Sequence, residues 1–244
     1  YLGLRGQNYL RTFPFGQGWG FGTVNPKIWE DWFDDDIRKT GSIFNVTNRN
    51  EVVLYTFGAD SHVDETSYVQ KKYIPINVYA DGTHTVVHNY SMELYGNTVD
   101  NYMLNNTQDL VLIRFADVLL MAAELNLGTA KAQSFLDRVR ARVNLPSVPA
   151  TLDNIKAERR FELAFEGVRF YDLLRWHDAD RVLNENQKDI VIYRSRTETV
   201  TKTITYRPET NGFLQIPLSE IELSKGVLTA NPGWGSEAAY QDIY

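Results

Sequence analysis

The chain of 244 residues contains no cysteine. This excludes disulfide bonds, thiolate catalysis and cysteine-type zinc sites. The sequence also has no apolar run that approaches the roughly 18 residues of a transmembrane helix, and no signal peptide. An excess of positive charge is lacking as well, because 31 acidic residues outnumber 25 basic ones and the net charge is -6. A chain with this balance is a poor partner for nucleic acid, which needs clustered lysine and arginine.

Residues that carry catalysis or bind metals are also few. Two of the four histidines, His84 and His88, have a spacing that would suit zinc on a helix, but their segment has the composition of a strand. There is no phosphate-binding Gly-Lys-Ser loop, no Gly-x-Ser-x-Gly elbow and no His-Glu-x-x-His motif. The acidic run at 34–36 favours a solvated loop, with a calcium site as the alternative. We therefore predict no metal, no cofactor and no catalytic residue.

Aromatic side chains are plentiful, at 13% of the sequence. They are dense in residues 1–26, where repeated glycines oppose any regular element and predict a loop. Flat rings with a polar edge suit a surface that stacks on sugars or forms an interface. The loop is therefore a candidate binding surface. The alternative is that its rings anchor the loop to the core.

The clearest helical patterns lie in the middle of the chain. Residues 112–127 are apolar on nearly all sides, which predicts a buried helix that ends at Gly128. Residues 132–143 carry an apolar stripe at helical spacing. Together they predict an antiparallel hairpin similar to one tetratricopeptide unit. A single unit cannot bury both of its faces, so this one must lean on other helices.

A third helix is expected to begin with Thr151 or Asp153 as its cap, to break at Gly167 and to resume as far as Trp176. Shorter elements are expected elsewhere. They are a helix that begins at Asn25-Pro26, an alternating segment at 73–79, a β-hairpin around 194–198, and a strand followed by a short helix within 213–222.

Acidic and basic side chains alternate along the third helix. Glu158, Glu162 and Glu166 lie four residues apart, which would place them on one helical face. Bases three residues away are expected to match the acids, in the pairs Arg159–Glu162, Glu166–Arg169, Arg169–Asp172 and Asp172–Arg175. We interpret this face as an ion-paired surface buried under neighbouring segments. An acid pair for glycoside hydrolysis or a di-iron site is the alternative, but arginines crowd the carboxylates and no Glu-x-x-His is present.

Three blocks of sequence resemble the SusD/RagB family in the expected order. The first is LIRFADVLLMAAE at 112–124 with LDRVRAR at 136–142, the second is AERRFELAFEGVRFYDLLRW at 157–176, and the third is IPLSEI at 216–221 with NPGW at 231–234. Asp36-Ile-Arg38 and Lys71-Lys-Tyr73 are weaker echoes of the family pattern. The similarity covers residues 27–244.

The resemblance implies a mainly α fold with tetratricopeptide-like helical hairpins, long irregular loops and a small β-hairpin. It divides the chain into a loop-rich ligand-facing part at 1–108, helices at 109–178, and a hairpin with a C-terminal tail at 179–244. Members of the family are longer, so the chain resembles their C-terminal half. The helical scaffold and the lipid anchor are expected on an N-terminal portion that is absent here.

The resemblance also implies a function. Members are surface lipoproteins of the outer membrane that bind glycans for uptake by a TonB-dependent transporter, and their glycan contacts come from variable aromatic loops. We expect Trp19 to stack on a sugar, with rings and polar groups around it from Phe21, Tyr9, Gln17, Asn8 and Arg11. We expect a binding protein and not an enzyme.

Three other functions remain open at this point. The same fold could bind peptides, as RagB-like members are thought to do. A glycoside hydrolase with an aromatic cleft would need unpaired acids in a groove. A purely structural helical-repeat adaptor would have no aromatic platform.

Overall fold

The fold was analysed in a computed structural model of the chain, which describes residues 23–47, 65–73, 77–79, 86–89, 109–193 and 198–235. Two compact units are distinguished. Unit 1 comprises Tyr1–Val168 and Ile190–Lys202, and unit 2 comprises Arg169–Asp189 and Thr203–Tyr244. None of the described helices has both the length and the apolar composition that a membrane crossing requires.

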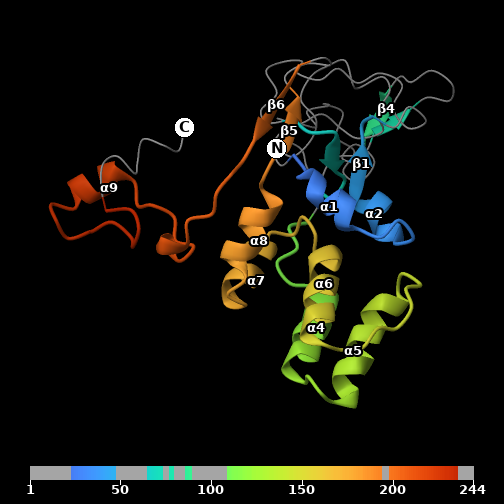
Figure 1. The fold of residues 1–244 in the computed structure, drawn as a ribbon. Coiled ribbons are helices and arrows are strands. Elements are labelled where there is room, and N and C mark those ends of the chain that lie inside the picture. The colour runs from blue at the N-terminus through green and yellow to red at the C-terminus, as the bar shows by residue number, and fades with distance from the viewer. Residues whose placement is uncertain are drawn as a thin grey trace. The chain divides into compact units, whose positions relative to one another are not determined.

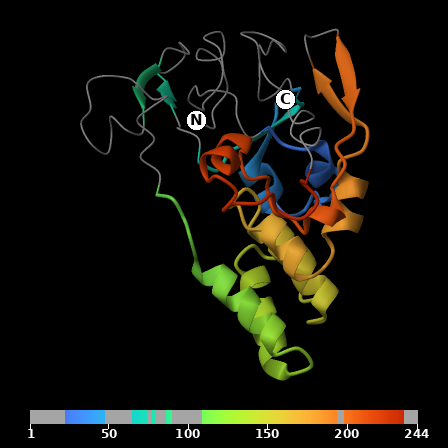
Figure 2. The ribbon, with the colours of Figure 1, turned by 90° about the vertical axis from the view of Figure 1, so that its left-hand side faces the viewer.

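A bundle of three helices forms the lower part of unit 1 in Figure 1: α4 (Phe115–Leu125), α5 (Ala130–Ala141) and α6 (Leu152–Glu162). Side-chain oxygens of Thr129 and Thr151 accept hydrogen bonds from backbone N–H groups in the first turns of α5 and α6. The hairpin of α4 and α5 is confirmed, and Figure 2 shows it from a second side. Its apolar core consists of Leu119, Leu120, Ala123, Leu136, Val139 and Ile155.

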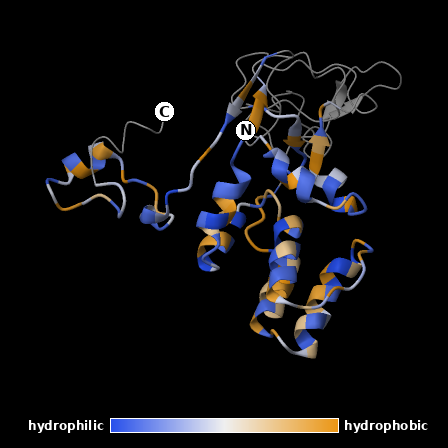
Figure 3. Ribbon diagram, viewed as in Figure 1, coloured by the Kyte–Doolittle hydropathy of each residue, from blue (hydrophilic) through white to orange (hydrophobic). Residues whose placement is uncertain are grey.

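The prediction that the first of these helices is buried on nearly all sides was wrong. Leu120 and Ala123 are fully buried, but Val118 and Leu125 lie on an exposed face of α4. Leu112 and Ile113 precede the helix and are exposed too. The reason is geometric, because α5 and α6 cover only one side of α4. Figure 3 shows that hydrophobic and hydrophilic residues are interspersed along the three helices.

The N-terminal part of unit 1 contains two short helices and a two-stranded ladder. Asn25 caps α1 (Pro26–Asp31), as expected, and the proline occupies the first turn, where its missing N–H costs nothing. Helix α2 (Ile37–Ser42) leads directly into β1 (Ile43–Asn45), which pairs antiparallel with β2 (Tyr68–Gln70). These elements pack on the end of α6 through a core made by Val24, Trp32, Ile43, Phe161 and Ala164.

Two further antiparallel ladders are present. The first covers only the end of the alternating segment expected at 73–79, because Tyr73 lies in a turn with a φ of 64°. Strands β3 (Asn77–Tyr79) and β4 (Val86–Asn89) pair with a register shift after Val78. Strands β5 (Ile190–Tyr193) and β6 (Thr199–Lys202) form the predicted hairpin. The strand expected before the last helix was wrong, because residues 213–217 are irregular and lead straight into α9 (Leu218–Leu223).

Unit 2 contains α7 (Arg169–Arg175), α8 (Ala179–Asn186), the 3-10 turn η3 (Pro208–Thr210) and α9. The expected resumption of the third helix to Trp176 is therefore a separate helix, α7. Beyond η3, Trp234 contacts two residues that precede it in the chain, Arg207 and Phe213. The Arg207 guanidinium lies over the ring of Trp234, 4.3 Å from its centroid, and the Trp234 Nε1 donates to the Phe213 carbonyl.

Candidate functional site

The residues predicted to contact the ligand lie outside the described part of the chain. They are Trp19, Phe21, Tyr9, Gln17, Asn8 and Arg11. The described residues do show where the predicted loop joins the fold. Thr23 forms a bridge with Val69, and Val24 is held to the same strand because its N–H donates to the Tyr68 carbonyl. The loop is thus connected to a point that the β1–β2 ladder fixes.

An aromatic pair lies next to this point. The rings of Trp29 and Tyr68 are stacked with 5.1 Å between their centroids, and the Lys39 ammonium lies 4.5 Å from the centre of the Trp29 ring. Both rings are partly buried against the core. The two rings therefore support the chain beside Thr23 and Val24, and they are not open for stacking on a sugar.

The most elaborate constellation of the described residues is an ion network at the upper end of the bundle. It links five cations to four carboxylates from α2, the end of β2, the start of α4, the end of α5 and the end of α6. Its members are Arg38, Lys72, Arg114, Arg140 and Arg142 with Asp36, Glu158, Glu162 and Glu166.

Arg38 is the centre of one half of the network. Its guanidinium donates to Asp36 at 2.7 Å, to Glu158 at 2.6 Å and to Glu162 at 2.7 Å. The side chains of all four residues are almost completely buried. A buried charge is tolerated only when it is paired and hydrogen-bonded. Asp36 orients the Arg38 side chain at the start of α2, and Glu158 and Glu162 hold that side chain, and so α2, against α6.

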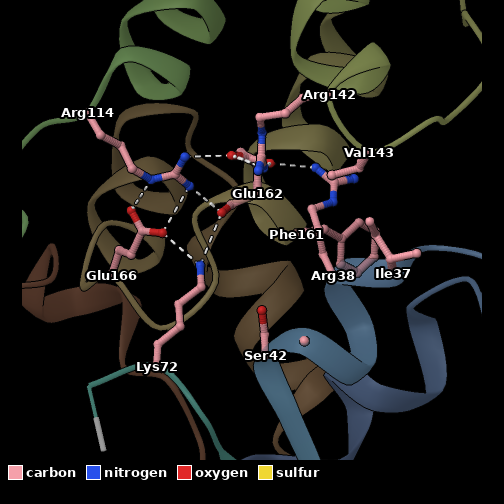
Figure 4. Close-up of a pocket in the computed structure, with 11 residues that line it drawn as sticks. Ile37, Arg38, Ser42, Lys72, Arg114, Arg142, Val143, Phe161, Glu162 and Glu166 are labelled. Atoms are coloured by element: carbon pink, nitrogen blue, oxygen red, sulfur yellow. Dashed lines mark hydrogen bonds and ion pairs between the residues drawn. The ribbon is translucent and has the colours of Figure 1, made fainter. Parts of the chain in front are cut away.

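Glu162 is the centre of the other half. It accepts hydrogen bonds from Arg114 at 2.5 Å and from Arg142 at 2.8 Å in addition to Arg38 (Figure 4). Burial alone would raise the pKa of the Glu162 carboxyl, but the hydrogen bonds from Arg114 and Arg38 outweigh it and lower the pKa to about 2. The carboxylate therefore stays ionised at neutral pH and cannot donate a proton in a reaction.

Glu166 completes the network from the turn beyond α6. Arg114 Nε donates to it at 2.7 Å and Lys72 Nζ at 2.7 Å. The Glu166 carboxylate and the two cations meet on one side of Glu162, whereas Arg38 and Arg142 approach Glu162 from the other (Figure 4).

The expectation that the acids are ion-paired and buried was confirmed, but their partners were predicted wrongly. Glu162 pairs with cations from other elements and not with Arg159, whose guanidinium donates to Asp117 at 2.7 Å. The pair Asp172–Arg175 is present. Glu166 does not share a helical face with the other two, because α6 ends at Glu162 and the chain turns through a left-handed Phe165, with a φ of 66°.

The prediction for the acidic run was wrong for one of its residues. Asp36 is not solvated, because it caps α2 and accepts hydrogen bonds from the Trp32 Nε1 at 2.8 Å and from Arg38. Its pKa is below the usual value because the bonds from Arg38 and Trp32 outweigh burial, which acts to raise it. Asp36 therefore belongs to the network and is not available to bind calcium.

A pocket of about 380 Å³ opens against this network (Figure 4). Its wall is formed by Ile37, Arg38, Gly41, Ser42, Lys72, Arg114, Arg142, Val143, Phe161, Glu162 and Glu166. Reasoning from the sequence did not find this pocket. The only signals were Asp36-Ile-Arg38 and Lys71-Lys-Tyr73, which were noted as family echoes without a role.

The model of the family described as "SusD family" matches residues 12–234. A curated relative, the "SusD-like protein P2" of Formosa agariphila, is 25% identical over 201 residues, which are 75% of this chain and 36% of that protein.

Solved structures show the same similarity. A "Laminarin binding SusD-like protein" is 31% identical with a TM-score of 0.66, and the match covers 95% of this chain and 43% of that one. The surface glycan-binding protein A from Bacteroides fluxus is 28% identical with a TM-score of 0.63, covering 90% of this chain and 42% of that one. The chain thus spans less than half the length of these relatives, and its mainly helical fold is theirs.

Proposed function

The chain belongs to the SusD family, and from this premise we propose that it is part of a protein that binds oligosaccharides at the cell surface for import. The observation that carries the proposal is the family match over residues 12–234 together with the similarity to a laminarin-binding protein. Capture is non-covalent. Sugar rings stack on aromatic faces, and polar side chains bond to the hydroxyl groups.

We place the ligand contacts in the loop that joins the fold at Thr23. Trp19 supplies the main stacking surface and Phe21 and Tyr9 further rings, while Gln17, Asn8 and Arg11 supply hydrogen bonds. The connection at Thr23 and Val24 supports this assignment, because it ties the end of the segment that carries these residues to the β1–β2 ladder.

The proposed mechanism contains no catalytic step. Each of the three glutamates of the AERRFELAFEGVRFYDLLRW block accepts hydrogen bonds from at least two cationic side chains. Glycoside hydrolysis needs one carboxylic acid that holds a proton near neutral pH. The lowered pKa of Glu162 argues against that role at this site.

We propose further that the protein acts at the outer face of the outer membrane, held there by a lipid anchor. A TonB-dependent transporter beside it receives the glycan.

Titration of glycans by calorimetry tests the proposal. Laminarin oligosaccharides and other neutral glycans are titrated into the protein and into its Trp19→Ala variant, with Tyr171→Ala as the control because Tyr171 is an exposed ring in unit 2. We expect binding to weaken by about 1–3 kcal/mol in Trp19→Ala, the scale of a lost aromatic stacking contact, and to stay unchanged in Tyr171→Ala. Equal affinity in all three proteins would remove Trp19 from the site. Binding of peptides but of no glycan would replace the proposal with the RagB-like alternative.

A further inference from the structure

The pocket against the ion network has the features of a binding site that lies apart from the aromatic loop. Its volume of about 380 Å³ falls within the range of small-molecule pockets, roughly 300–1,000 Å³. It is lined by four cations, by the carboxylates of Glu162 and Glu166, and by the apolar side chains of Ile37, Val143 and Phe161. Such a wall suits a ligand with a charged end and a carbon body.

The charges of the network do not balance. Among the described residues, the connected ion pairs join five cations to only four carboxylates. One positive charge is left over, and the cation with the most solvent contact is Arg142, whose side chain is 57% exposed and lines the pocket. The surplus therefore faces the open space and not the core.

The hydroxyl group of a mostly buried residue, Ser42, points into the same space. Ser42 is only 5% exposed, and no hydrogen-bond partner for its side chain is present among the described residues. Figure 4 shows the Ser42 oxygen directed toward the middle of the pocket, apart from the bonds that join the other residues. The Ser42 oxygen is therefore open to the pocket, and its hydrogen-bonding capacity is available to a ligand.

The backbone next to Ser42 leaves room for a ligand. A side-chain carbon added at Gly41 would meet no atom within 4 Å. Because Gly41 is part of the pocket wall, this face of α2 borders open volume.

We propose that this pocket binds a small organic carboxylate, with the Ser42 hydroxyl donating to it and Arg142 and Lys72 supplying the compensating charge. A single negative charge matches the single surplus cation, whereas a phosphate would bring about 1.5 to 2 charges. The apolar side chains of Ile37, Val143 and Phe161 contact the rest of the ligand. Burial lowers the pKa of the Lys72 ammonium despite Glu166 beside it, and a bound carboxylate would counter that effect.

Two sources of such a carboxylate are distinguished by the probes. Glucuronate represents a sugar acid and N-acetylleucine represents the C-terminus of a peptide. Glucose serves as the neutral control and inorganic phosphate as the control with higher charge. Each is titrated into the protein by calorimetry at low and at raised ionic strength, because partly exposed charge pairs weaken with salt.

Two variants test the geometry. Ser42→Ala removes the hydroxyl without breaking any bond within the described residues, and Gly41→Leu fills the open volume with an apolar side chain. Arg181→Gln is the control, because Arg181 is exposed in unit 2 and lies outside the network. We expect at least one of the two carboxylates to bind, its affinity to fall tenfold or more in both variants, and Arg181→Gln to behave as the parent.

The proposal is overturned if neither carboxylate binds, if glucose or phosphate binds as well as the carboxylates do, or if Ser42→Ala binds as the parent protein does. Circular dichroism establishes that each variant is folded. The outcome is separate from that of the glycan titration, because neutral glycans and Trp19 report on the loop while carboxylates and Ser42 report on the pocket.

Discussion

Helices α4 and α6 lie side by side, and each has residues that depart from the rule that apolar side chains are buried and charged side chains are exposed. On α6 the charged residues Glu158, Arg159 and Glu162 are buried. On α4 the apolar residues Phe115, Val118 and Leu125 are exposed, with Leu125 at 86%. From hydropathy alone, these residues of α6 would be expected to be exposed and these residues of α4 to be buried.

The difference shows that partners decide burial. The carboxylates of α6 are buried because guanidinium groups from α2, the start of α4 and the end of α5 reach them and satisfy their oxygens. The outer face of α4 stays exposed because no described element covers it.

Removal of Arg38 should have the largest effect on the stability of the buried charges of α6. Arg38→Ala leaves Asp36, Glu158 and Glu162 with fewer donors in a site that is almost sealed from water. We expect the free energy of unfolding to fall by about 3–5 kcal/mol, the cost of breaking a buried pair. Urea denaturation followed by circular dichroism measures it.

Arg181→Ala serves as the control for that change. Arg181 forms exposed pairs with Asp178 and Glu185, which are worth about 0–1 kcal/mol. If the two variants lost the same stability, the burial of the network would have no energetic consequence and the comparison would fail.

The two faces of α4 provide the next test. Leu120→Ala removes a fully buried side chain from the apolar core and should cost about 2–5 kcal/mol. Leu125→Ala on the exposed face should change the free energy of unfolding by less than about 0.5 kcal/mol. Thermal denaturation of both variants measures this. A large loss in Leu125→Ala would mean that the outer face of α4 is covered after all.

Acid should weaken the network through Glu162. Its pKa is about 2 in the folded protein and 4.5 is the ordinary value, so the unfolded chain binds more protons between these values. The contribution of Glu162 is therefore complete above pH 4.5 and is lost as the pH falls toward 2. The full difference is about 3 kcal/mol.

Urea denaturation at pH 7 and at pH 3 measures this loss, with Glu162→Gln as the reference that cannot titrate. The parent protein should lose more stability between the two pH values than the variant does. Equal losses would show that the three arginines do not hold the Glu162 carboxylate in its ionised form.

The parts of the fold that were predictable from the sequence depend on local signals. Thr151 and Asn25 cap the helices that follow them because their oxygens reach N–H groups two or three residues away. The pairing of β5 with β6 follows from two short β-branched segments near each other in the chain. Such interactions join residues that are close in the sequence, so a local pattern is enough to predict them.

The ion network could not be predicted because its members are distant in the sequence. The spacing of Glu158 and Glu162 indicated a charged face, but it could not name Arg38 as the partner or exclude Arg159. The end of α6 was also hidden, since the left-handed turn at Phe165 and Gly167 has no strong signature beyond the glycine. The pocket depends on both features and was therefore missed.

One bond of the network bears on how the protein is made. Arg38 Nη1 donates to Glu158, which follows it by 120 positions. During synthesis Asp36 is available to Arg38 at once, but the other two acceptors leave the ribosome only after most of the helical bundle has been translated. Asp36 therefore pairs with Arg38 from the start, but α2 takes its final position only after α6 has been made and Glu158 and Glu162 can reach the same guanidinium.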